Sequence, residues 1–113
     1  MGIQYGDFGT TTATIPSGSN TSGTIDCLVR GSPAELHMPA AFDGATVTFQ
    51  NALTNDGTYL IMRKDGADVS VTVTASRAIW LDPSIFYAAK YLRIVSASNE
   101  TAERAIEVNH RKT

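Results

Sequence analysis

The sequence is poor in cysteine, tryptophan and proline, and it contains no long apolar run. The single cysteine, Cys27, excludes a disulfide within the chain. No stretch approaches the roughly 18 apolar residues that a membrane-spanning helix requires. The N-terminal residues also lack the charged and then apolar pattern of a signal peptide. These absences predict a protein that folds in the cytosol and has no membrane partner.

Charge is also scarce. Only 18% of the residues are charged, and the formal net charge is −2. A chain with this balance has no general attraction for nucleic acid or for anionic membranes, so neither is an expected partner. The hydrophobic share of 42% nevertheless indicates a folded chain rather than a disordered one. Its 113 residues are the length of one domain.

Motifs for catalysis and for metal binding are missing as well. The sequence contains no Gly-x-Ser-x-Gly nucleophile motif and no phosphate-binding loop. Neither His37 nor His110 has a histidine or cysteine at the spacing of a zinc site. The turns at 55–57 and 65–68 lack the remaining positions of an EF-hand loop. The sequence does not exclude a catalytic pair of carboxylates of the glycosidase type, because such a pair is brought together only by folding. We nevertheless expect no enzyme, no catalytic residue, no metal and no cofactor.

What the sequence does contain is alternation of apolar and polar residues, which is typical of β-strands. Turn residues interrupt this alternation every eight to twelve positions. The pattern predicts an all-β fold: an antiparallel β-sandwich or jelly roll of about eight strands with one short helical turn. The expected strands are Thr11–Ile15, Gly23–Arg30, Glu35–Met38, Ala45–Gln50, Tyr59–Lys64, Asp68–Thr74, Arg77–Leu81, Tyr91–Ser96 and Arg104–His110.

Local signals place the turns and the limits of the domain. Asp65-Gly66 predicts a tight hairpin, because these residues readily adopt positive φ angles. Asp82 and Pro83 have the residue types of a helix cap and a first helical position, so a helical turn is expected to continue to Ala89. Residues 1–10 are rich in glycine and are expected to form a flexible arm. Residues 11–113 are expected to form one β-sandwich domain.

The same alternation assigns side chains to the core or to the surface. Cys27 is expected to face the core together with Ile25 and Val29, as a small buried hydrophobe rather than a reactive thiol. His37 is expected on a strand surface. Trp80, flanked by apolar residues, is expected in the core, and four other aromatic side chains are expected to pack with any hydroxyls at the rim. These four are Tyr59, Phe86, Tyr87 and Tyr91.

Several segments together resemble a known group of proteins. They are Met38–Phe42 leading into Ala45–Gln50, then Arg77–Pro83, Phe86 and Lys90–Ile94. In these segments the chain resembles small β-sandwich structural proteins of tailed bacteriophages, which decorate or cement capsids or build parts of tails and fibres. The resemblance extends over about residues 11 to 110. It consists of strand and turn patterns, and it carries no catalytic residues onto this chain.

The resemblance implies a structural protein of the virion, assembled in the host cytoplasm and most like a capsid decoration or cement protein. Its expected partners are the major capsid protein, other virion proteins or its own copies in an oligomer or lattice. Contact is expected through the arm and one edge of the sandwich, with Tyr5 and Phe8 as apolar anchors. The basic segment His110-Arg111-Lys112 is expected to be a solvated tail. The alternative is that Arg111 and Lys112 contact an acidic partner. The alternative function is a carbohydrate-binding module of a phage tail or fibre.

Overall fold

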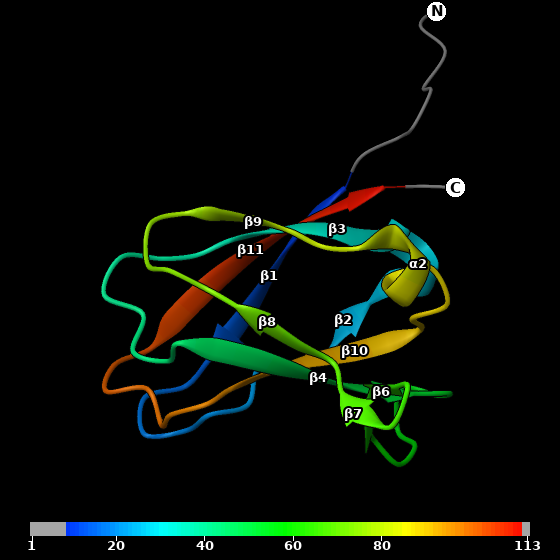
Figure 1. The fold of residues 1–113 in the computed structure, drawn as a ribbon, viewed down its shortest axis with the longest axis horizontal. Coiled ribbons are helices and arrows are strands. Elements are labelled where there is room, and N and C mark those ends of the chain that lie inside the picture. The colour runs from blue at the N-terminus through cyan, green and yellow to red at the C-terminus, as the bar shows by residue number, and fades with distance from the viewer. Residues whose placement is uncertain (1–8, 112–113) are drawn as a thin grey trace, which may run out of the picture.

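The computed structural model describes residues 9–111, which form two antiparallel sheets packed against each other, as Figure 1 shows. The first sheet has four strands in the order β1-β11-β3-β9. They span Thr10–Ile15, Arg104–Arg111, Ser32–His37 and Ala78–Trp80, respectively. The second sheet has five strands in the order β2-β10-β4-β5, and β8 pairs with the other half of β4. They span Ile25–Asp26, Tyr91–Ser96, Thr46–Ala52, Leu60–Ile61 and, for β8, Ser70–Thr72.

Three small elements complete the architecture. A hairpin of β6 (Arg63–Lys64) and β7 (Ala67–Asp68) connects β5 to β8 and protrudes from the sandwich (Figure 1). The helical turn α1 covers Cys27–Arg30, and α2 covers Pro83–Phe86. The predicted all-β sandwich is therefore confirmed, although the described part of the chain has eleven strands and two helical turns rather than about eight strands and one turn.

Apolar side chains from alternate positions of both sheets fill the space between them. This alternation is the physical reason for the sandwich, because each sheet can shield its apolar face from water only by packing it against the apolar face of the other sheet. The first sheet contributes Ala13, Ile15, Leu36, Ile106 and Val108, and the second contributes Ile25, Val47, Phe49, Leu92 and Ile94.

The strand predicted at 23–30 is wrong in its second half. Only Ile25–Asp26 pairs with β10, after which the chain turns into α1. The Asp26 side chain accepts hydrogen bonds from the backbone N–H groups of the second and third helical residues, and Gly31 ends the turn with a φ of 101°. Cys27 is buried as predicted, but Val29 is 63% exposed because a helical turn does not keep the alternation of a strand.

The strand predicted at Glu35–Met38 spans Ser32–His37 instead, so it starts earlier and includes Pro33. Pro33 is the second residue of β3 and lies opposite His110 of β11. The register between these two strands shifts between Asn109 and His110. A proline is tolerated at such a β-bulge, because the regular ladder that needs its missing N–H is already interrupted there.

The predicted hairpin turn and the predicted start of the helical turn are confirmed. Asp65 and Gly66 have φ angles of 54° and 81°, as the tight hairpin between β6 and β7 requires. The Asp82 carboxylate accepts a hydrogen bond from Ser84 N at 3.0 Å, and Pro83 is the first residue of α2. The helical turn ends at Phe86, three residues earlier than predicted.

The ends of the sandwich differ slightly from the predicted limits. Strand β1 begins at Thr10, so this residue belongs to the domain rather than to the arm predicted at 1–10. His110 is fully buried, which makes the expectation of a solvated tail at this position wrong. It lies in the last strand, where Pro33 and Thr11 face it from the neighbouring strands.

Candidate functional site

Of the four predicted contact residues, the structure describes one. Tyr5, Phe8 and Lys112 lie outside the described residues. Arg111 is the last residue of β11; it is exposed and opposite Ser32 of β3. It also lies at the rim of a shallow depression on the first sheet, together with Trp80 and Asn109. The structure therefore places Arg111 on an accessible face, and its role in contact remains a prediction.

The prediction that Trp80 lies in the core is wrong, because its side chain is 69% exposed. It lies on the edge strand β9, where Ile79 packs against the core opposite Leu36. Its neighbour Trp80 therefore points to the outer face of the first sheet, opposite Glu35. Tyr87 is equally exposed, at 69%, whereas Phe86 is buried as predicted.

Polar side chains surround Trp80 on this outer face. Across the strands β1, β11, β3 and β9, the register places Thr10, Asn109, Glu35 and Trp80 in one row, which we call the Trp80 row. The next row contains Thr12, Glu107, His37 and Ala78. His37 is exposed as predicted, and its Nε2 lies 2.7 Å from a Glu35 carboxylate oxygen. The face is thus a polar surface with one exposed indole at its edge, beside the shallow depression that Glu35 and Asn109 also line.

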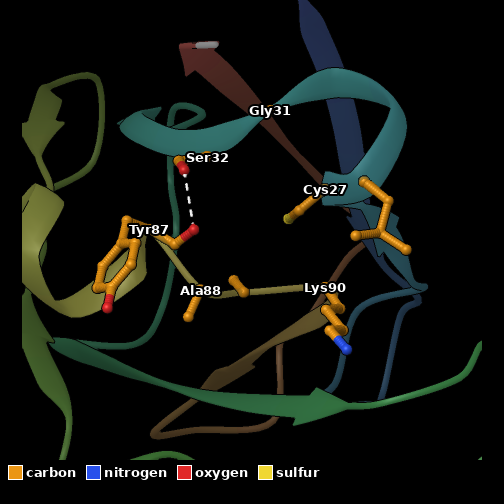
Figure 2. Close-up of a pocket in the computed structure, with 8 residues that line it drawn as sticks. Cys27, Gly31, Ser32, Tyr87, Ala88 and Lys90 are labelled. Carbon is orange, nitrogen blue, oxygen red and sulfur yellow. Dashed lines mark hydrogen bonds between the residues drawn. The ribbon is translucent and has the colours of Figure 1, made fainter. Parts of the chain in front are cut away.

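A second hollow lies between the two helical turns, as Figure 2 shows. Ser32 Oγ donates a hydrogen bond to the Tyr87 carbonyl oxygen at 3.3 Å, which ties β3 to the end of α2. The Cys27 side chain lies at the base of this hollow. Burial, with a smaller contribution from the charge of Asp26, raises the pKa of the Cys27 thiol to about 12. The thiol is therefore protonated near neutral pH and is a poor nucleophile, in agreement with its predicted role as a small hydrophobe.

A third depression, which we call the β5 groove, is mainly apolar. Its most exposed apolar side chains are Leu53, Leu60 and Ile61, which are 74%, 66% and 50% exposed. The groove lies beside the short strand β5, at the edge of the five-stranded sheet. Sequence analysis missed it, although the consecutive residues Leu60, Ile61 and Met62 were a signal. A single strand cannot turn three successive side chains toward one core.

The end of the sandwich near Glu100 contains a buried charge. The Glu100 carboxylate is fully buried and accepts hydrogen bonds from the backbone N–H groups of Asp43 and Gly44, from Ser96 Oγ and from Arg104 Nε. The pKa of Asp43 is lowered because Thr101 donates backbone and hydroxyl hydrogen bonds to it and because Arg104 is close. The donors and acceptors of this network are satisfied by one another. The network therefore stabilises the loops, and the Glu100 carboxylate is not available as a reactive group.

His110, near the end of β11, is also fully buried, and both nitrogens of its ring form hydrogen bonds. Its Nδ1 donates to the Gly31 carbonyl oxygen at 2.8 Å, and its Nε2 accepts from the Thr11 hydroxyl at 2.8 Å. These two bonds satisfy the neutral ring. Burial lowers the pKa of His110 below its usual value, despite the bond to Gly31, which favours the charged form.

We expect the pKa shift of His110 to make stability fall with decreasing pH. Because the unfolded chain binds a proton more readily than the folded chain, the free energy of unfolding decreases once the pH falls below about 6.5. Urea unfolding at a series of pH values measures this dependence. The variant His110→Gln is expected to show a smaller decrease over the same range. An identical pH dependence in both proteins would contradict the assignment.

Residues 9–111 lack the side-chain cluster of a metal site and the long apolar helix of a membrane span. This part of the chain contains no cluster of three or more histidine, cysteine or acidic side chains that could hold a metal ion. None of its helices is long and apolar enough to cross a membrane. No family model, no curated protein and no solved structure matches this chain.

Proposed function

We propose that this protein is a structural component of a tailed-phage virion that decorates the capsid and catalyses no reaction. The observation that carries the proposal is the β5 groove, where Leu53, Leu60 and Ile61 are exposed together. Contact of these apolar side chains with water is unfavourable, so a partner that covers all three gains free energy on binding. The resemblance of the strand segments to phage decoration proteins supplies the class of partner.

The occupant of the β5 groove is an apolar segment of the major capsid protein. Strand β5 has only two residues and lies at a sheet edge, so a partner segment can approach it without displacing a long native strand. Residues 1–8 precede β1, which is an edge strand of the other sheet. The arm predicted from the sequence, with Tyr5 and Phe8, is therefore proposed as a second contact.

Cosedimentation with capsids of the cognate phage tests this function. The unmodified protein is expected to bind at a fixed ratio to the major capsid subunit. Leu60→Asp is expected to reduce the affinity at least tenfold, because it places a charge in an apolar contact worth more than about 1.4 kcal/mol. Val29→Asp changes an equally exposed aliphatic residue outside the groove and is the matched control.

Three results of this experiment have defined meanings. Saturable binding that is lost in Leu60→Asp and kept in Val29→Asp supports the proposed groove. Equal binding by both variants contradicts a role for the groove and leaves deletion of residues 1–8 as the test of the arm. Absence of binding by the unmodified protein, with a stable monomer in light scattering, contradicts the decoration function itself.

A further inference from the structure

The Trp80 row has the chemical features of a sugar-binding surface. Its indole is 69% exposed at the edge of the sheet and beside a shallow depression, where its ring can be covered by a ligand. Burial of such a ring contributes strongly to binding, and indoles bind groups that offer both apolar faces and hydrogen-bonding edges. A pyranose ring has this combination, with C–H groups on its faces and hydroxyls around its rim.

The neighbours of Trp80 supply partners for the hydroxyls. The Glu35 carboxylate is positioned by His37 through one oxygen, and its second oxygen can accept hydrogen bonds from a ligand. The next position of the row is Asn109, whose amide both donates and accepts. Within residues 9–111, the Asn109 side chain has no hydrogen-bond partner. Two strand spacings separate Asn109 from Trp80, about 10 Å, which leaves room for an oligosaccharide to contact both.

Other exposed aromatic rings lack this setting. Arg93 covers the Tyr59 ring, with its guanidinium carbon 3.7 Å from the ring centroid, so that this face is already occupied. Tyr87 is as exposed as Trp80, but it follows α2 and lies outside the polar rows of the sheet. Only Trp80, among the aromatic residues that the structure describes, combines an exposed ring with adjacent hydrogen-bonding side chains on the outer face of a sheet.

The charged side chains on this face determine whether a neutral or an anionic sugar can bind. Glu35 and Glu107 lie on neighbouring strands of the same face, and their two carboxylates outweigh the guanidinium of Arg111 at the rim of the depression, so the balance of charge repels an anionic ligand. We propose that the Trp80 row binds neutral hexopyranose oligosaccharides, with one ring stacked on Trp80 and hydroxyls bonded to Glu35 and Asn109. This activity is separate from capsid binding through the β5 groove, so that one chain can hold a particle at one surface and a glycan at another.

The experiment uses the fact that Trp80 is the only tryptophan of the chain. Its fluorescence therefore reports on this surface alone. Titration of the full chain with neutral and anionic oligosaccharides is expected to change the emission with neutral glycans only. In calorimetry, Trp80→Ala is expected to lower the affinity at least tenfold. Tyr87→Ala is the matched control, with equal exposure and an expected affinity within twofold of the unmodified chain.

Thermal unfolding of both variants checks that the exposed substitutions leave the fold intact. Asn109→Ala is a further variant, expected to weaken binding without altering the fluorophore. Absence of any glycan-dependent change in emission and heat would overturn the proposal, as would equal losses in Trp80→Ala and Tyr87→Ala. Stronger binding of anionic glycans would overturn the assigned class. Loss of capsid binding in Trp80→Ala, without any glycan binding, would assign the row to a protein partner and also overturn the proposal.

Discussion

Replacing Glu100 by alanine is expected to destabilise the domain by about 4 kcal/mol, which is a large part of the stability of a domain of this size. The carboxylate is fully buried and accepts four hydrogen bonds, two of them from the backbone N–H groups of Asp43 and Gly44. Without it, these donors and Nε of the largely buried Arg104 side chain lose their acceptor, while Nη2 of Arg104 keeps its bond to Asp43. Each buried unsatisfied donor costs about 1–3 kcal/mol.

Urea unfolding measures the effect, with Glu103→Ala as the matched control. Glu103 is exposed, lies three residues along the chain and is expected to change the free energy of unfolding by less than about 0.5 kcal/mol. Glu100→Gln retains one acceptor oxygen and is expected to fall between the two. A loss for Glu100→Ala as small as that for Glu103→Ala would show that water replaces the carboxylate and that the network does not hold the loops.

The second large effect is expected for Phe49→Ala, at about 3–5 kcal/mol. Phe49 lies in the centre of β4 with no exposed surface, and its ring meets Phe86 of α2 edge to face, with centroids 4.8 Å apart and an interplanar angle of 76°. Removing the ring leaves a cavity between the sheet and the helical turn. Phe49→Leu retains most of the volume and is expected to cost less than about 1.5 kcal/mol.

A double-mutant cycle separates the ring contact from general packing. If the edge-to-face contact contributes, Phe49→Ala and Phe86→Ala together are expected to differ from the sum of the single variants by about 0.5–1.5 kcal/mol. Leu60→Ala, in the exposed β5 groove, is the control and is expected to change stability by less than about 0.5 kcal/mol. Additive losses for the two phenylalanines would contradict direct coupling.

The central strands could be predicted from the sequence because one of their faces is buried along the whole length. Strand β10 has the predicted limits, and β11 extends only one residue beyond its prediction. Their alternation follows directly from the pleat of a strand that covers a core. Short edge strands give a weaker pattern. At Cys27–Arg30, the cap formed by Asp26 and the glycine at 31 determine the backbone, so the apparent alternation is misleading.

The candidate surfaces were harder to predict than the fold. Trp80 is flanked by apolar residues, but only the pairing of Ile79 with Leu36 determines which side of β9 faces the core. The Trp80 row joins residues from strands far apart in the sequence, and a register shift lies next to Asn109. Neither long-range register nor the position of a bulge follows from local periodicity. The burial of Glu100 could not be predicted either, because two of its four hydrogen-bond donors come from a loop more than 50 residues away in the sequence.

The pairing of β1 with β11 has a consequence for the synthesis of the protein. Thr10 lies opposite Asn109, so the first strand finds its neighbour only after nearly the whole domain has left the ribosome. Until then β1 has no partner in its own sheet, and its apolar side chains Ala13 and Ile15 have no completed core to enter. Closing so long a segment of chain is slow compared with forming local hairpins. Nascent chains therefore expose an unpaired strand, which can pair with a wrong neighbour until β11 is available.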